Sequence, residues 1–184
     1  MNDPIQHLLD EHHDIMLQVA DLRRAVEDLG RRGEAALPEA LPVLGAVGRM
    51  MAGQLLQHAR KEDEALFPAL EEIFGREGSP TGVMRREHAD IHAQAARFRE
   101  TLHELNQIEH PAIVAHGRSL RELAAGGAGA EALRATGAEI VRLLDLHFAK
   151  EEQVLFPMAR EMLSPEAMEA VMRQMRALEG SKAG

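Results

Sequence analysis

The stretch HARKEDEALFPAL, residues 58–70, returns later in the chain as HFAKEEQVLFPMA, residues 147–159, with His, Lys, Glu, Leu, Phe and Pro at identical places. A second motif precedes each copy, as EHHDI at residues 11–15 and as EHADI at residues 87–91. The apolar residues around all four motifs recur every three or four positions, which is the period of an α-helix with one buried face. The repeat therefore predicts two related helical hairpins.

Helical periodicity extends over almost the whole chain of 184 residues, and no stretch alternates with period two for long enough to predict a strand. Four long helices are expected, because Pro and Gly residues separate four periodic segments. The first begins at Asp3-Pro4 and ends near Gly30 and Gly33, the second runs from about Leu41 to Gly75, the third follows Ser79-Pro80 and breaks at His110-Pro111, and the fourth runs from about Leu133 to Met158.

Two shorter helices complete the expected fold. One crosses the end of the bundle from Pro111 to Ala125, between the third and fourth long helices. The other follows the cap Ser164-Pro165-Glu166 and is amphipathic and rich in Met. The predicted fold class is all-α, an up-down-up-down four-helix bundle over residues 1–163, with residues 164–184 as a C-terminal helix and tail packed on the same domain.

The composition excludes several classes of function. The chain has no Cys, Trp or Tyr, so disulfides, thiolate metal sites and thiol nucleophiles are ruled out. Its formal charge of −9 would repel nucleic acid, and no window is apolar over the ~20 residues that a membrane span requires. The start of the chain lacks the pattern of a signal peptide, so we expect a cytoplasmic protein without nucleic-acid or membrane partners.

Six polar residues stand where the helical period calls for an apolar one. Residues four apart on a helix share a face, so the His and the Glu of each HxxxE motif can reach one point. A buried carboxylate without a partner costs several kcal/mol, and the inward faces at this level show no Lys or Arg. Nitrogen and oxygen donors without sulfur suit Fe, Mn, Zn or Cu. Matched helix lengths place all six at one height: His12, His58, Glu62, His88, His147 and Glu151.

The pattern resembles the hemerythrin-like family, in its HHE cation-binding branch, in which EHxxI on the first and third helices and HxxxE…LFP on the second and fourth supply a di-iron centre. The resemblance covers about Ile5 to Met162. It implies two Fe ions with an oxo or hydroxo bridge, and Zn or Mn as substitutes. It also implies the ligands of these ions. The terminal ligands are His12, His58, His88 and His147, the bridging ligands are Glu62 and Glu151, and His92 is one further imidazole ligand.

One position of such a centre stays open for a diatomic ligand. The oxygen carriers of the family have HxxxxD on the fourth helix, whereas His147 is followed by Glu151 and Glu152, which argues against a dedicated O2 carrier. The acids that precede the motif His residues, Glu11 and Glu87, are expected on solvated helix faces, and a hydrogen bond to a metal ligand is the alternative for them.

We expect a non-haem di-iron protein that binds or reduces a small oxidant, namely O2, NO or peroxide. Two alternatives stay open: an iron or oxygen sensor or iron-handling module without turnover, and a metal-free helical module whose Met-rich last helix binds a partner. The same helix is the expected face of a homodimer. No enzymatic activity is assigned, and any activity would be redox chemistry on these oxidants. A ferritin-like oxidase needs two Glu-x-x-His motifs, and only Glu100 to His103 forms one.

Overall fold

The computed structural model describes residues 3–76, 79–115 and 128–180, which are helical and contain no strand. The first rod is α1 (Pro4–Arg32), which a short 3-10 turn, η1 (Gly33–Ala36), joins to the second. The second rod consists of α2 (Leu37–Met50), η2 (Met51–Leu55), α3 (Leu56–Lys61), η3 (Glu62–Leu66) and α4 (Phe67–Phe74). The third is α5 (Pro80–Ala115), and the fourth is α7 (Ala128–Lys150), η5 (Glu151–Leu155) and α8 (Phe156–Met162), followed by α9 (Pro165–Gly180).

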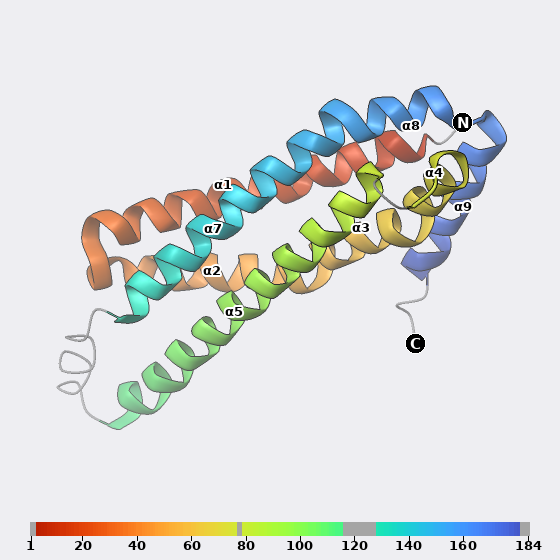
Figure 1. Cartoon of the computed structure of the whole chain (residues 1–184). Helices are drawn as coiled ribbons and strands as arrows, with labels where there is room; N and C mark the ends of the chain where they lie inside the picture. The colour runs from red at the N-terminus through yellow and green to blue at the C-terminus, as the bar shows by residue number, and fades with distance from the viewer. Residues whose placement is uncertain (1–2, 77–78, 116–127, 181–184) are drawn as a thin grey trace.

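The four rods pack side by side as a closed bundle. The first rod contacts the second and the fourth, and α5 contacts α2 and α7; at one end, α4 of the second rod also contacts α8 of the fourth. Figure 1 shows that the chain direction alternates from one rod to the next. The helix α9 lies at one end of the bundle, against α1, α3 and η3 (Figure 1). The all-α bundle expected from the sequence is confirmed.

Both ends of α1 follow from local sequence. The Asp3 side chain accepts a hydrogen bond of 2.9 Å from the N–H of Ile5, and Pro4 occupies the first turn, where its missing N–H costs nothing. At the other end Gly33 has φ of +57°, a left-handed conformation that favours glycine, and its N–H donates to the Leu29 carbonyl. The turn to the second rod is thereby set by two residue types that the sequence shows directly.

The helix α5 continues through the proline at which we predicted a break. Residues 111–115 belong to α5, so no separate crossing helix begins at Pro111. A proline inside a helix removes one backbone hydrogen bond, which a helix of 36 residues can lose without ending, and Pro42 is likewise held inside α2. The remainder of the predicted crossing helix, residues 116–125, lies outside the described residues.

Each copy of the repeated motif contains one turn of π-helix, η3 in the second rod and η5 in the fourth. These wide turns begin at Glu62 and Glu151 and end just before a Phe-Pro pair. Pro68 has no N–H and cannot donate to the carbonyl of Glu64. That carbonyl instead accepts a hydrogen bond from Gln174 of α9. π-Turns inside helices are frequent at functional sites, and here both open at a motif glutamate.

The apolar core is divided into two clusters. One includes Ile15, Val19 and Leu22 of α1, and the other includes Ile5 and Leu8 of the same helix. Since His12 lies between these two groups in the sequence, the inward polar residues form a layer between the clusters. The buried side chains of α9 are those of Val171, Met172 and Met175. They lie at the second-cluster end of the bundle, and Val171 and Met175 are members of that cluster.

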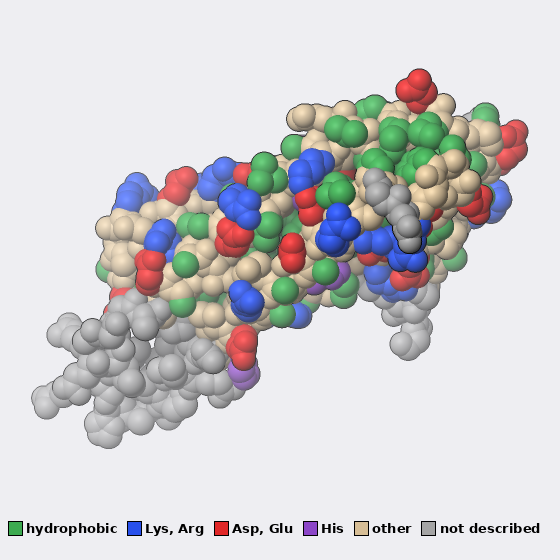
Figure 2. All heavy atoms as spheres, in the orientation of Figure 1, with side chains coloured by type: hydrophobic (Ala, Val, Ile, Leu, Met, Phe, Trp, Pro, Cys, Tyr) green, Lys and Arg blue, Asp and Glu red, His purple; other side chains and the backbone are tan. Residues whose placement is uncertain are grey.

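The surface of the bundle carries charges of both signs. Figure 2 shows Lys and Arg interspersed with Asp and Glu along the face in view, where few His side chains are visible. Among the described helices, none combines the length and the apolar character that crossing a membrane would demand. The cytoplasmic location stays a prediction.

Candidate metal centre

All six polar residues that were predicted to point inward are buried. Their exposed fractions lie between 0 and 4%. Every rod contributes, because the EHxxI motifs lie on α1 and α5 and the HxxxE motifs cross from α3 into η3 and from α7 into η5. We name them in three groups: the first His pair (His12 and His58), the second His pair (His88 and His147) and the shared carboxylates (Glu62 and Glu151).

The shared carboxylates belong to two sets of potential metal ligands at once. One set joins them to the first His pair and the other joins them to the second, and within each set the ligand atoms lie within 4.8 Å of one another. Two overlapping sets with common carboxylates have the composition of a site for two adjacent cations. The sequence predicted this convergence, and the predicted ligands other than His92 are brought together.

The oxygens of the shared carboxylates are buried without hydrogen bonds. Nε2 of His12 is 3.2 Å from Oε2 of Glu151, and Nε2 of His147 is 3.0 Å from Oε1 of the same residue. Nε2 of His88 is 3.2 Å from Oε2 of Glu62. These contacts lack the geometry of hydrogen bonds, so none of the four carboxylate oxygens has a hydrogen bond. Such burial is costly unless a cation compensates it.

A second ring of acids, which we call the outer carboxylates, surrounds the four imidazoles. Each lies within hydrogen-bonding distance of one Nδ1 atom, in the pairs His12–Glu152 (2.8 Å), His58–Glu11 (3.0 Å), His88–Asp63 (3.1 Å) and His147–Glu87 (3.1 Å). An ionised carboxylate only accepts, so Nδ1 carries the proton in each ring. The lone pair of a neutral ring then lies on Nε2, which faces the shared carboxylates. This is the usual way in which proteins orient a metal-binding histidine.

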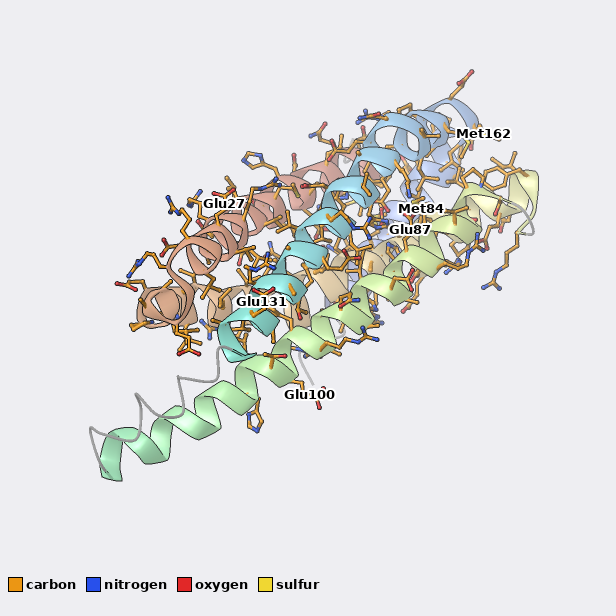
Figure 3. All side chains as sticks on the ribbon, turned by 60° about the vertical axis from the view of Figure 1, so that its left-hand side comes forward. Glu27, Met84, Glu87, Glu100, Glu131 and Met162 are labelled. Atoms are coloured by element: carbon orange, nitrogen blue, oxygen red, sulfur yellow. The ribbon has the colours of Figure 1, made fainter. Side chains whose placement is uncertain are left out.

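Glu11 and Glu87 were expected on solvated faces, and that expectation is wrong. Their side chains are only 21% and 22% exposed, and both hold an imidazole of the neighbouring helix. Glu87 lies between α5 and α7 (Figure 3). The signal was present in the sequence: an acid directly precedes the EHxxI histidine, and another directly follows the motif glutamate, in both copies.

The electrostatics of the layer favour an ionised Glu11 and a protonated His88 when no metal is bound. Burial alone would raise the pKa of Glu11, but hydrogen bonds from His58 and Lys61 lower it to about 2. Burial alone would lower the pKa of His88, yet Asp63 and the shared carboxylates raise it to about 12. Burial alone would likewise raise the pKa of Glu151, but the neighbouring imidazoles of His12, His147 and His88 lower it. Protons on the imidazoles thus offset the buried negative charge, and a metal ion would displace them.

Lysines stand behind two of the outer carboxylates. Lys61 contacts Glu11, and at the equivalent place in the second copy Lys150 contacts Glu87. Lys61 is 1% exposed, although the sequence showed no Lys or Arg on the inward faces at this level. It lies beneath α9, outside the layer of metal-facing atoms, where its contacts are with acids and with His7. Periodicity alone could not reveal this burial because α9 comes from a distant part of the chain.

The remaining candidates are placed differently. His92 is in neither ligand set; its ring centre is 6.5 Å from that of His88, and its Nε2 is buried without a partner. Its role as a fifth imidazole ligand stays a prediction. The ferritin-like motif does not face inward, because Glu100 and His103 are both exposed, and Figure 3 shows Glu100 on the outer side of α5.

Aromatic rings close the layer on both sides. Phe148 stacks on His12 with ring centres 3.9 Å apart, and Phe67 stacks on His88 at 5.8 Å. Phe156 lies 5.3 Å from His12. The apolar rings exclude water from the imidazoles and so strengthen their electrostatic interactions with the shared carboxylates.

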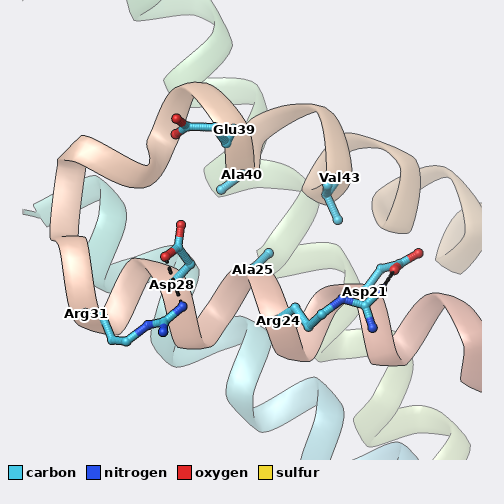
Figure 4. Close-up of a pocket in the computed structure, with 8 residues that line it drawn as sticks. All are labelled: Asp21, Arg24, Ala25, Asp28, Arg31, Glu39, Ala40 and Val43. Atoms are coloured by element: carbon cyan, nitrogen blue, oxygen red, sulfur yellow. Dashed lines mark hydrogen bonds and ion pairs between the residues drawn. The ribbon is translucent and has the colours of Figure 1, made fainter.

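A groove of about 410 Å³ lies elsewhere, between α1 and α2 (Figure 4). Its floor is formed by Ala25, Ala40 and Val43, and no histidine lines it. The arginines at its rim pair with neighbouring acids, as in the contact of 3.2 Å between Arg31 and Asp28. The groove therefore offers no donor set comparable to that of the buried layer.

The donor set fits a metal centre, since it combines unpaired carboxylate oxygens with oriented imidazoles. A family model described as hemerythrin HHE cation-binding domain matches residues 3–109 and 104–180. These two matches contain every residue predicted to bind metal. No individual curated protein matches the chain. On the family match, the chain belongs to the hemerythrin HHE cation-binding domain family, and its buried layer of His and Glu contains groups that could hold a metal ion.

Proposed function

We propose that this chain is a non-haem di-iron protein that binds or reduces a small oxidant, O2, NO or peroxide, at a carboxylate-bridged site. One observation carries the proposal: Glu62 and Glu151 belong to both ligand sets, and none of their oxygens has a hydrogen bond. A single ion would leave one His pair without a metal. Two ions use both pairs and both carboxylates.

The donor set favours iron among the available metals. Four imidazoles are more than Ca²⁺ or Mg²⁺ sites use, and the absence of sulfur removes the donors that Cu(I) prefers. Two His with carboxylate oxygens and open positions are typical of non-haem iron. Two divalent ions carry more charge than two carboxylates, which leaves room for an oxo or hydroxo bridge. Zn or Mn would be accepted by the same donors.

The residues of the chain have defined tasks in this proposal. Iron supplies the change of oxidation state that binding or reducing an oxidant requires. The outer carboxylates hold each imidazole with its Nε2 toward the centre. The rings of Phe67, Phe148 and Phe156 exclude water from the layer. The protons that leave the imidazoles on metal binding pass to the solvent, so metal affinity should rise with pH.

The second candidate function is a sensor or iron-handling module in which no turnover occurs. The contact between buried Lys61 and Glu179 of α9 favours it, because it connects the ligand layer to a helix outside the bundle. Metal that binds only the folded state at a thousandfold excess over its Kd would stabilise the chain by about 4 kcal/mol. A metal-free interaction module is disfavoured by the buried, unpaired oxygens of the shared carboxylates.

The proposal is tested by loading the chain with Fe²⁺ without oxygen, then measuring iron by elemental analysis and recording absorption spectra. We expect two irons per chain, and a band after exposure to O2, NO or peroxide that disappears on reduction. The variant His13→Ala is the matched control, since His13 is the exposed neighbour of His12. Fewer than two irons, or a colourless protein after loading and oxidation, would contradict the proposal.

The same samples distinguish the two candidates. An oxidant-binding centre changes its spectrum with each oxidant that it takes. An iron sensor or iron-handling module instead binds two irons and gains thermal stability, while its spectrum is insensitive to all three oxidants. A melting temperature that does not change on chelation would contradict the second candidate.

A further inference from the structure

The helix α9 is connected to the first His pair by a path of polar contacts. Glu179, in the last turn of α9, contacts Nζ of Lys61 and lies 2.8 Å from Nε2 of His7. Lys61 also contacts Oε1 of Glu11, and Oε2 of Glu11 accepts the hydrogen bond of 3.0 Å from Nδ1 of His58. The path therefore runs from a helix at the end of the bundle to an imidazole whose other nitrogen faces the shared carboxylates.

The equivalent path in the second copy ends at the solvent. Lys150 contacts Glu87, and Glu87 lies 3.1 Å from Nδ1 of His147, which repeats the lysine, the acid and the histidine of the first path but has no counterpart of Glu179 among the described residues. The side chain of Lys150 is 47% exposed, whereas that of Lys61 is 2% exposed. Water and salt solvate and screen the charge of an exposed lysine. The charge of a lysine buried under α9 is instead stabilised by its protein partners.

Three separate contacts seat α9 over Lys61. Val171 and Met175 are 2% and 0% exposed and belong to the second apolar cluster. Gln174 donates to the Glu64 carbonyl that Pro68 leaves without a helical partner. Glu179 adds the ionic contact with Lys61. The position of α9 is thus defined by packing, and Glu179 is the member that transmits it to the ligand layer.

The acids around Lys61 do not form a further metal site. His7, Glu11 and Glu179 lie close enough together to hold a cation. The ammonium of Lys61 already contacts all three of them. A positively charged group in that place excludes a metal ion and makes this cluster a support for the lysine.

We infer that Glu179 is a positioning residue for metal binding: through Lys61 and Glu11 it orients His58, so that docking of α9 tunes the metal affinity of the first His pair and not that of the second. The inference rests on the proposed two-metal function. Coupling between two equilibria is reciprocal, so metal at the first His pair must in turn stabilise docked α9. Loss of the partner of a metal-binding histidine costs 10- to 100-fold in affinity, and for Glu179, which acts through two intermediates, we expect about tenfold.

The test places Glu179→Gln in two backgrounds, each of which retains one His pair. His147→Ala retains the first pair, and His58→Ala retains the second. Fe²⁺ affinity is measured without oxygen by competition with a chelator. We expect Glu179→Gln to weaken binding about tenfold in the His147→Ala background and to leave it unchanged in the His58→Ala background. Equal effects in both backgrounds, or no effect in either, would overturn the inference.

The matched control is Glu169→Gln, which makes the same charge change on the same helix. The side chain of Glu169 is 57% exposed, and the nearest charged atom of Arg173 is 3.9 Å away. This variant should bind Fe²⁺ as the unaltered chain does. The conservative variant Glu179→Asp should recover part of the affinity, which a loss of folding would not predict.

A second measurement needs no altered ligand. Amide hydrogen exchange is compared with and without Fe²⁺ in the full chain. Metal should slow exchange in α9 in the unaltered chain and in Glu169→Gln, and should have less effect on α9 in Glu179→Gln. If Fe²⁺ leaves the exchange rates in α9 unchanged in all three proteins, the inferred coupling between α9 and the metal is wrong.

Different results contradict the proposed two-iron function and the role of Glu179. An unaltered chain that binds fewer than two irons contradicts the proposed function, and the inference falls with it. An unaltered chain that binds two irons, with affinities that Glu179→Gln does not change, contradicts the inference alone.

Discussion

Lys61 and Lys150 occupy the same place in the two copies of the repeat, three residues after a histidine of the buried layer. Both contact the acid that holds that histidine, yet the side chain of Lys61 is 2% exposed and that of Lys150 is 47% exposed. The difference comes from α9, which packs on α3 and η3 in the first copy. The repeat reproduces contacts set by local spacing, while an added helix changes their dielectric surroundings and hence their strength.

Two of the outer carboxylates contact a histidine of their own hairpin, and the other two contact a histidine of the other hairpin. Glu11 and Glu87 hold a histidine of their own hairpin, whereas Asp63 and Glu152 each reach a histidine of the other hairpin. The two hairpins therefore complete each other's ligand geometry. The comparison between them predicts which substitutions affect both halves and which affect only one.

The largest loss of bound metal should come from substituting the shared carboxylates, because each of them belongs to the ligand sets of both halves. Glu62→Ala and Glu151→Ala should each lose at least one of the two metals and keep a helical fold, since both side chains belong to both ligand sets. Iron content and circular dichroism check this. Glu64→Ala, at an exposed neighbour, should keep both metals. Full metal retention in Glu62→Ala would remove the bridging assignment.

The next largest effect is a difference in metal affinity between equivalent substitutions in the two halves. Glu11→Gln should weaken Fe²⁺ binding toward the upper end of the range of about 10- to 100-fold, because Glu11 holds both His58 and buried Lys61. Glu87→Gln should weaken Fe²⁺ binding by an amount toward the lower end of that range, since Lys150, which contacts Glu87, is solvated. Chelator competition measures both. Equal losses would mean that the burial of Lys61 makes no difference to metal affinity.

A smaller effect is expected on the stability of the metal-free chain. Lys61→Met should cost about 2 kcal/mol, less than the full penalty for breaking a buried ion pair because Glu11 and Glu179 are partly exposed. Lys150→Met should cost less than about 1 kcal/mol, as surface pairs usually do. Urea unfolding of both variants gives the comparison. If Lys61→Met is as stable as Lys150→Met, then α9 does not make the two halves different.

The smallest effect concerns the contact between α1 and α7, where the two halves meet. A Cβ added at Gly137 would lie 2.7 Å from Cγ2 of Val26 and 3.3 Å from Cδ1 of Leu22. Gly137→Ala should therefore cost about 1 kcal/mol, because overpacking outweighs the better helix propensity of alanine. Gly53→Ala, where the added Cβ meets nothing within 4 Å, should be neutral or stabilising in the same thermal unfolding measurement.

The sequence predicted the inward residues well for a physical reason. A polar side chain on an apolar stripe is visible in the sequence, and the helical period carries it to the interior, as for His88 and Glu151. The break predicted at Pro111 was wrong because a long helix tolerates one missing hydrogen bond. The solvated role predicted for Glu11 was wrong because an acid beside an inward histidine can turn toward the adjacent helix.

What the sequence determined by itself is the helical architecture, the repeat and the six side chains that face the interior, since all three depend on periodicity within single helices. Only the tertiary structure decided which acid holds which imidazole and which of two equivalent lysines is buried. Those pairings join residues up to 140 positions apart, as in His12 and Glu152. They depend on how whole helices lie against one another, which no local pattern records.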